Sequence, residues 1–204
     1  YKHMDTSDSI PLEETLEALG ELVKQGKVRQ IGLSNETPWG TMKYLELAET
    51  KSLPRVASIQ NAYNLVNRGF EIGLSEVAMH EQVGLLAYSP LAQGTLTGKY
   101  LGGQMPQGSR LALFGDGPLM MRYKGDKTQQ AIEMYVNLAK KYEIDPAQLA
   151  IQFCNIQPFV TSTIIGATTM EQLKTCIDSV DLDITKEIMN EIRGIHKEIP
   201  NPAP

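Results

Sequence analysis

The sequence predicts an α/β protein built on a parallel sheet. Three observations indicate this fold class. Short apolar segments with the character of strands alternate with longer segments that have helical periodicity. The expected strands have the character of buried strands and do not alternate strictly between apolar and polar residues, as a sheet covered by helices requires. Polar residues follow the ends of the expected strands, which is where α/β proteins place their binding sites.

The first elements follow from local patterns. Residues 10–26 combine leucines at helical spacing with a proline in the first turn and a glycine at the end, which is typical of an amphipathic helix. The short run 27–33 stops at Ser-Asn and is expected to be a strand. A Thr-Pro pair opens the next helix, predicted over 37–50, because threonine is a good cap and proline fits the first turn. Residues 55–60 are then expected as the second strand.

The same alternation continues with a helix over 71–82 and a strand over 84–88. Between residues 89 and 126 no sustained period is found and glycine is frequent, so this stretch is expected to be a long loop. Leucines and a phenylalanine within it offer apolar anchors, which favours a lid over a solvated linker. Three further helices are predicted over 127–142, 146–156 and 186–196.

A β-branched run over 163–165 is expected as the fourth strand, and Gly166 ends it. Two overlapping sequences, Thr168–Glu171 and Thr169–Gln172, each fit a helix capping box. A strand that turns through glycine into a capped helix leaves backbone N–H groups at the positive end of the helix dipole, where a phosphate can bind. An ordinary βα turn with good caps is the alternative interpretation.

Composition limits the function classes. The chain has 204 residues, a formal net charge of −5 and a pI of about 5.3, which argues against binding to nucleic acid or to an anionic membrane. Without a recognisable signal or membrane span, a cytoplasmic protein is expected. Cys154 and Cys176 have no metal-binding or redox spacing and are expected as reduced core thiols. His3, His80 and His196 are expected to be solvated or to lie at helix ends, so no metal site is predicted.

Four motifs, in chain order, carry a family resemblance: IGLSNET, SIQNAYN, LLAYSPLAQGTLTGKY and STIIGATTMEQL. Together they resemble the aldo-keto reductases, in particular the branch of the bacterial Tas-type proteins and the potassium-channel β-subunits. The resemblance implies a TIM-type (β/α)8 barrel, in which residues 1–204 form the C-terminal half of one barrel domain with strands five to eight and a lid over 89–126. The family's catalytic Asp, Tyr, Lys and His lie on strands one to four, so no catalytic residue is assigned here.

The resemblance implies an NADP-binding half. Ser34, Asn35 and Gln60 resemble the residues that face the nicotinamide carboxamide, and Tyr88 the aromatic residue that stacks on the nicotinamide ring. The other implied cofactor residues are Ser89, Pro90, Leu91 and Gly94 along the pyrophosphate, Lys99 and Arg110 as basic residues of the loop and lid, and Gly166, Thr168 and Gln172 at the adenosine 2′-phosphate. Cys176 departs from the family, since many relatives have an asparagine there that contacts adenine.

The activity implied for a full-length relative is reduction of aldehydes or ketones by hydride transfer from NADPH. The alternative is an NADP-sensing or scaffold subunit with little turnover. The expected partners are a small carbonyl substrate and either the N-terminal half-barrel of the same protein or a second copy of this chain. A further half is expected because an open four-stranded sheet exposes two edges and one face.

Overall fold

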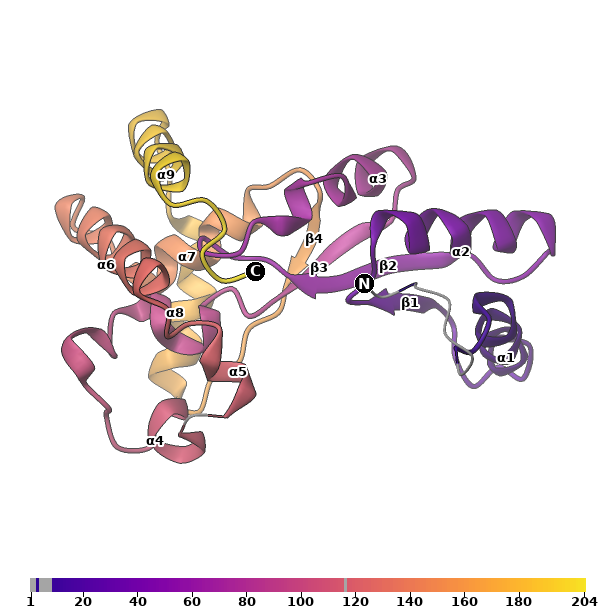
Figure 1. Cartoon of the computed structure of the whole chain (residues 1–204), viewed down its shortest axis with the longest axis horizontal. Coiled ribbons are helices and arrows are strands. Elements are labelled where there is room, and N and C mark those ends of the chain that lie inside the picture. The colour runs from indigo at the N-terminus through magenta and orange to yellow at the C-terminus, as the bar shows by residue number, and fades with distance from the viewer. Residues whose placement is uncertain (1–2, 4–8, 116) are drawn as a thin grey trace. The chain divides into compact units, whose positions relative to one another are not determined.

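The computed structural model describes residue 3, residues 9–115 and residues 117–204, apart from the side chains of residues 118 and 119 (Figure 1). The chain divides into two compact units. Unit one comprises Tyr1–Asn61 and Phe70–Leu86, and unit two comprises Ala62–Gly69 and Ala87–Pro204. In the described part of the chain the strands form one four-stranded sheet in the order β1-β2-β3-β4.

Strands and helices alternate, as predicted. Up to residue 88 the elements are α1 (Leu12–Lys24), β1 (Ile31–Ser34), α2 (Pro38–Thr50), β2 (Val56–Ala62), η1 (Gly69–Glu71), α3 (Leu74–His80) and β3 (Gly84–Tyr88). Beyond it they are η2 (Ala92–Thr97), η3 (Leu101–Gly103), α4 (Arg110–Phe114), α5 (Pro118–Met121), α6 (Asp126–Lys141), α7 (Pro146–Asn155), β4 (Val160–Thr163), α8 (Met170–Asp178), η4 (Ser179–Asp181) and α9 (Lys186–Glu198).

In unit one, β1 and β2 are parallel neighbours, with Ser34 paired to Gln60. The strands approach closely at Gly32, where a Cβ atom would lie 2.8 Å from the Ser58 hydroxyl oxygen. Figure 1 shows β1 and β2 with their C-terminal ends at the same edge, because parallel strands run in one direction. The polar residues that follow the two strands are therefore neighbours.

The core of unit one is apolar. Its buried side chains include those of Leu16, Leu45, Ala48, Val56, Ile59, Leu74, Ala78, Val83 and Leu85. The helical periods of residues 10–26 and 37–50 predict Leu22 and Met42 on the inner faces of their helices, but both are exposed, at 36% and 43%. Tyr44 and Leu47 are buried on α2 where the sequence pattern emphasised Met42. Leu45 and Ala48, which the same helical period predicts on the inner side of α2, are buried as expected, so only Met42 departs from the predicted side.

Unit two has an aromatic core. The rings of Tyr63 and Phe153 are stacked with centroids 5.7 Å apart, and Phe159 meets Tyr63 edge-on at 5.3 Å. α7 begins where predicted, because the Asp145 carboxylate accepts hydrogen bonds from the N–H groups of Ala147 and Gln148 at 2.7 and 3.2 Å. Both cysteines are buried and free, in agreement with their prediction as core thiols.

Several predicted bounds differ from the structure. The first strand, expected over 27–33, is Ile31–Ser34. The fourth strand is Val160–Thr163, three residues earlier than expected, and Ile164 and Ile165 follow it with 38% and 36% exposure. The long loop of residues 89–126 contains short helical segments, η2, η3, α4 and α5. These segments have three to six residues, too short to produce a recognisable hydrophobic period.

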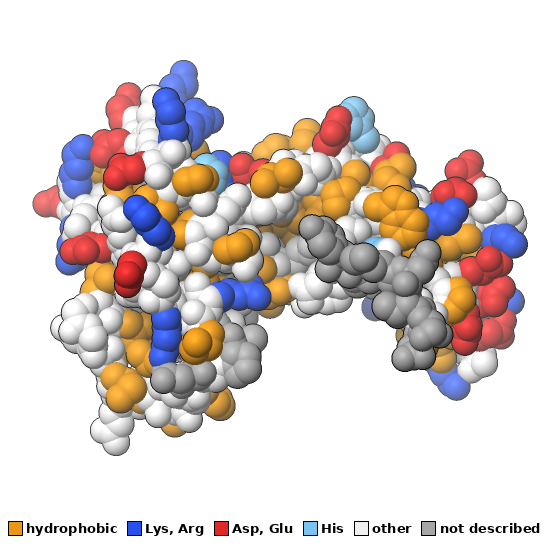
Figure 2. All heavy atoms as spheres, in the orientation of Figure 1, with side chains coloured by type: hydrophobic (Ala, Val, Ile, Leu, Met, Phe, Trp, Pro, Cys, Tyr) orange, Lys and Arg blue, Asp and Glu red, His pale blue; other side chains and the backbone are white. Residues whose placement is uncertain are grey.

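The surface is mixed in charge. On the face seen in Figure 2, lysine and arginine side chains are interspersed with aspartate and glutamate side chains and with exposed hydrophobic ones. Within the described residues, no helix is both long and apolar enough to traverse a lipid bilayer.

Candidate functional site

The predicted nicotinamide-facing residues of unit one lie together. Ser34 and Gln60 are paired across β1 and β2, and both are exposed, as is Asn35. The Asn35 N–H donates to the Gln60 carbonyl oxygen at 2.9 Å, and the Asn35 side-chain amide donates to the Ser34 hydroxyl at 3.3 Å. We refer to Ser34, Asn35 and Gln60 as the polar tips. They present hydroxyl and amide groups from two adjacent strand ends.

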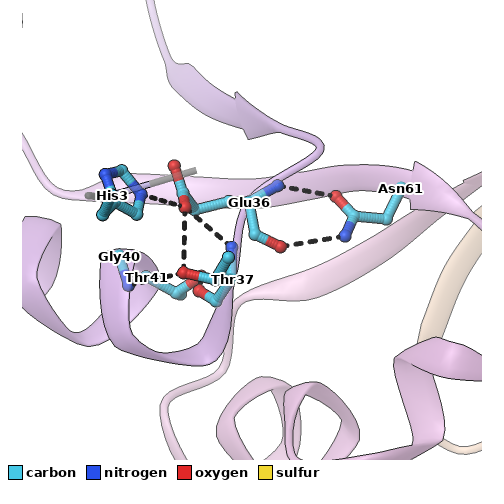
Figure 3. A network of polar contacts seen from close by, with 6 residues as sticks. All are labelled: His3, Glu36, Thr37, Gly40, Thr41 and Asn61. Carbon is cyan, nitrogen blue, oxygen red and sulfur yellow. Dashed lines mark hydrogen bonds and ion pairs between the residues drawn. The ribbon is translucent and has the colours of Figure 1, made fainter. Parts of the chain in front are cut away.

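Asn35 has a backbone conformation that non-glycine residues seldom adopt, with φ of +52°. Asparagine enters this region more readily than most residues, but the conformation still needs support from its surroundings. Here the support comes from Asn61, whose side chain forms two hydrogen bonds with the backbone of Glu36 (Figure 3). The Glu36 N–H donates to Asn61 Oδ1 at 3.1 Å, and Asn61 Nδ2 donates to the Glu36 carbonyl oxygen at 3.1 Å.

The Glu36 carboxylate is buried, with the residue only 4% exposed. Its Oε1 atom accepts hydrogen bonds from the N–H and the hydroxyl of Thr37 at 2.7 and 3.3 Å. His3 Nε2 lies 2.5 Å from the same oxygen and donates to it when it carries a proton (Figure 3). Gly40 completes the arrangement, since a Cβ atom there would lie 2.2 Å from Glu36 Oε1. A buried charge is tolerated only with such partners.

His3 therefore differs from its prediction. Its side chain is 16% exposed and its ring lies 5.2 Å from the Trp39 ring, so the expectation of a solvated histidine was wrong. The burial of Glu36 and the role of Asn61 were also missed. The sequence does contain one signal for them: a glycine in the first turn of a helix, which is unfavourable unless another group needs the space.

A second group lies in unit two, directly after β3. Ser89 has φ of +55°, and its carbonyl oxygen accepts hydrogen bonds from Asn64 Nδ2 and from the Ala92 N–H, both at 2.9 Å. Its hydroxyl accepts from the Gln93 side-chain amide at 3.1 Å. Tyr88, immediately before it, is half-buried. The turn after β3 is thus rigidly held, chiefly by a buried asparagine that was not predicted as a site residue.

In the loop that follows, the side chain of Lys99 lies close to the backbone of Gly94. A Cβ atom at Gly94 would lie 3.0 Å from the Lys99 ammonium nitrogen, which itself lies 5.2 Å from the centre of the Tyr100 ring. The Tyr100 hydroxyl accepts a hydrogen bond from the Leu111 N–H at 3.4 Å, in the first turn of α4. The loop is therefore tied to the helix that begins with Arg110, whose side chain is exposed. Two other predicted residues of this loop differ in exposure: Pro90 is buried and Leu91 half-buried.

The third group, also in unit two, is the corner between β4 and α8. Gly166, Thr168 and Gln172 are all exposed there. Of the two capping boxes considered, only one half of Thr169–Gln172 forms, with the Gln172 N–H donating to the Thr169 hydroxyl at 3.2 Å. The Gln172 side chain accepts from the N–H and hydroxyl of Thr168 at 3.0 and 3.1 Å. A phosphate bound here would compete with Gln172 for the Thr168 N–H.

Neither cysteine is chemically activated. Burial strongly raises the pKa of the Cys154 thiol, whose sulfur lies 3.5 Å from the Tyr63 carbonyl oxygen. Burial, and then the nearby Asp145 carboxylate, raise the pKa of Cys176. A thiol with a raised pKa is a poor nucleophile and a poor metal ligand. In the part of the chain that the structure describes, no three His, Cys, Asp or Glu side chains are grouped so that they could hold a metal ion.

Comparison with known proteins gives consistent matches. The model of the Aldo/keto reductase family matches residues 3–197. The chain is 49% identical over 204 residues to Protein tas of Escherichia coli strain K12. This match covers all of this chain and 58% of the length of that protein. It is 33% identical over 184 residues (89% of the chain) to L-glyceraldehyde 3-phosphate reductase of the same strain, covering 52% of it. It is 30% identical over 193 residues (93% of the chain) to a probable voltage-gated potassium channel subunit beta of Oryza sativa subsp. japonica, covering 59% of it.

Proposed function

Because the chain belongs to the aldo/keto reductase family, we propose that it carries the NADP(H)-binding part of an oxidoreductase that reduces aldehydes or ketones. The family's fold is a (β/α)8 barrel, so the predicted fold class is confirmed. The chain spans a little more than half the length of the relatives just named. We further propose that its strands are strands five to eight of the barrel.

The observation that carries the proposal is the arrangement of the polar tips. A nicotinamide carboxamide has one carbonyl acceptor and one NH2 donor group. The hydroxyl of Ser34 and the amides of Asn35 and Gln60 offer both donors and acceptors on adjacent strand ends, which fits that group. Binding sites of this kind orient a cofactor by a small number of polar groups. Hydride transfer requires that the nicotinamide ring be held in a fixed orientation toward the substrate.

The groups of unit two, taken by themselves, suit other parts of NADP(H). Tyr88 offers a half-exposed aromatic ring, on which a nicotinamide can stack so that one of its faces meets the substrate. Lys99 and Gly94 place a positive charge beside a backbone that lacks a side chain, which suits a pyrophosphate. Thr168 and the first turn of α8 suit a 2′-phosphate, with Arg110 as a further cation from the lid. When bound, NADPH supplies the hydride, and the residues named here bind and orient it.

The test uses the full-length protein. NADPH binding is followed by quenching of intrinsic fluorescence, and turnover by loss of NADPH absorbance with a panel of small aldehydes and ketones. Gln60→Ala is expected to weaken NADPH binding about tenfold, the effect of one lost hydrogen bond with a neutral partner. Asn137→Ala, on the exposed face of α6, is the matched control and is expected to bind like the wild type. Full-length protein that binds no NADPH would sink the proposal.

The second candidate is an NADP-sensing or scaffold subunit. It is favoured by the 30% identity to a protein named as a probable potassium channel subunit beta. The two candidates share the cofactor site and differ in turnover. Tight NADP(H) binding with negligible reduction of every carbonyl in the panel, together with a stoichiometric protein partner, would favour this second function.

We also propose that the open sheet is completed by a further half-barrel, which comes from the same protein or from a second copy of this chain. We propose the cytoplasm as the location of the protein. β1 lies at one end of the strand order and β4 at the other, and unpaired edges invite pairing. Residues 1–204 expressed alone are expected to self-associate. A monodisperse monomer that unfolds in one cooperative transition would contradict this expectation.

A further inference from the structure

We infer that Asn61 and Glu36, neither of which faces outward with the polar tips, are positioning residues that set the tips for the nicotinamide carboxamide. This inference rests on the proposed cofactor site and adds two residues to it. All the groups involved lie in unit one.

The first step is the double hydrogen bond of Asn61. Its side chain binds both the N–H and the carbonyl oxygen of residue 36, each at 3.1 Å. The asparagine amide accepts through its oxygen and donates through its NH2 group at the same time. The backbone on the C-terminal side of Asn35 is thereby fixed to the end of β2.

The second step is the anchoring of the Glu36 side chain. Its carboxylate points into the contact formed by Thr37, His3 and Gly40, on the side of residue 36 away from Asn61 (Figure 3). With 3% of its side chain exposed, it is held from the side opposite to Asn61. Residue 36 therefore has both its backbone and its side chain fixed, and little freedom is left for the residue before it.

The third step is the strain at Asn35. Its φ of +52° places its side chain next to the Ser34 hydroxyl, and its N–H on the Gln60 carbonyl oxygen. A residue outside its preferred region relaxes when its surroundings no longer hold it. Loss of the Asn61 bonds would release Glu36, and Asn35 would then return to an extended conformation that turns its amide away from Gln60.

The experiment compares two cofactors on full-length protein. NADP and its 3-acetylpyridine analogue differ in one group: the analogue has a methyl where NADP has the carboxamide NH2. The wild type is expected to bind NADP about tenfold more tightly, the contribution of one hydrogen bond. In Asn61→Ala this ratio is expected to fall close to one. Adenosine 2′,5′-bisphosphate, which has no nicotinamide, is expected to bind the wild type and the variant equally.

The ratio separates positioning from general damage. A variant that is merely destabilised loses affinity for NADP, the analogue and the fragment alike, and its ratio is unchanged; that result overturns the inference. Asn61→Asp is the second variant. Its carboxylate can accept from the Glu36 N–H but cannot donate to the Glu36 carbonyl, so its ratio is also expected to fall. If both variants unfold where Asn137→Ala stays folded, Asn61 serves the fold alone, and the inference is overturned.

Two outcomes distinguish this inference from the proposed function. A wild type that binds neither NADP nor the fragment defeats the proposed function itself. A wild type that binds NADP and the acetyl analogue with equal affinity defeats only the inference, because the tips then do not read the carboxamide. Neither outcome depends on turnover, so the inference can be tested whichever of the two candidate functions holds.

Discussion

Replacing Asn64 by alanine is expected to destabilise unit two more than any surface substitution. Asn64 is fully buried, with 0% exposure. Its Oδ1 atom accepts hydrogen bonds from the N–H groups of Val66 and Asn67 at 3.0 and 2.9 Å, and its Nδ2 donates to the Ser89 carbonyl at 2.9 Å. One side chain thus closes its own turn and holds the turn after β3.

The size of this destabilisation depends on which hydrogen bonds the backbone partners of Asn64 keep after the substitution. The Asn67 N–H also donates to the Asn64 carbonyl oxygen at 3.1 Å, and the Ser89 carbonyl also accepts from the Ala92 N–H, so both keep a partner after truncation. The Val66 N–H loses its acceptor in a buried place, which costs about 1–3 kcal/mol. With about 1 kcal/mol for the lost bond to Ser89, the expected loss is roughly 2–4 kcal/mol.

Urea denaturation of full-length Asn64→Ala, followed by circular dichroism, measures this loss. Because the chain has two compact units, the slope m must be compared with that of the wild type before the two midpoints are converted to free energies. Asn137→Ala, which removes an exposed amide, is the control and is expected within about 0.5 kcal/mol of the wild type. A loss below about 1 kcal/mol at unchanged m would refute the reasoning that Val66 is left without an acceptor.

Three further predictions concern other parts of unit two. Phe153→Ala is expected to lower the free energy of unfolding, measured by urea denaturation, by about 3–5 kcal/mol. Phe114→Ala, at a side chain 67% exposed, should change it by under about 0.5 kcal/mol. Equal effects of the two variants would contradict the assigned core. Burial raises the pKa of Cys154, so iodoacetamide should alkylate it at pH 8 only on unfolding, and rapid labelling of native protein would contradict this. The hydrogen bond from Lys141 lowers the pKa of Glu191, so that pair stabilises the fold above the ordinary glutamate pKa and is lost as pH falls through the lowered one. Glu191→Gln should therefore differ from the wild type at pH 7 and match it in strong acid; a difference that persists in acid is evidence against the pair.

Most helices could be predicted because their signals are local. α7 is an example, where an aspartate cap and a proline stand at the first positions of an apolar period. The position of β4 could not be fixed in this way. Both Val160–Thr163 and the run after it are rich in β-branched residues, and the choice depends on the hydrogen bonds of the neighbouring strand. The Ile164 N–H, for example, donates to the Ala87 carbonyl at 2.8 Å, a contact between residues 77 positions apart.

The exposed part of the candidate site was open to prediction, and its buried part was not. Ser34 and Gln60 follow from the rule that polar residues at the ends of parallel strands share one edge. Glu36 was missed because a glutamate beside a Thr-Pro helix start is normally solvated. Its burial depends on Asn61, 25 residues away, and on His3, 33 residues away. Only Gly40 in the first turn of α2 pointed to a close contact there.

The division of the site into exposed binding residues and the buried or half-buried residues that support them has a physical cause. A polar side chain that binds a ligand must stay accessible, so it cannot be fixed by packing, and ordering it on binding costs entropy. Within each unit that cost is reduced by polar residues behind the binding groups: Asn61 behind Asn35, and Asn64 behind Ser89. Both asparagines bond to backbone atoms, so they fix the positions of Asn35 and Ser89 without occupying the side chains of those residues. Substitutions at the supports should therefore weaken the binding of the ligand part that each unit holds, while the ligand's contacting residues are unchanged.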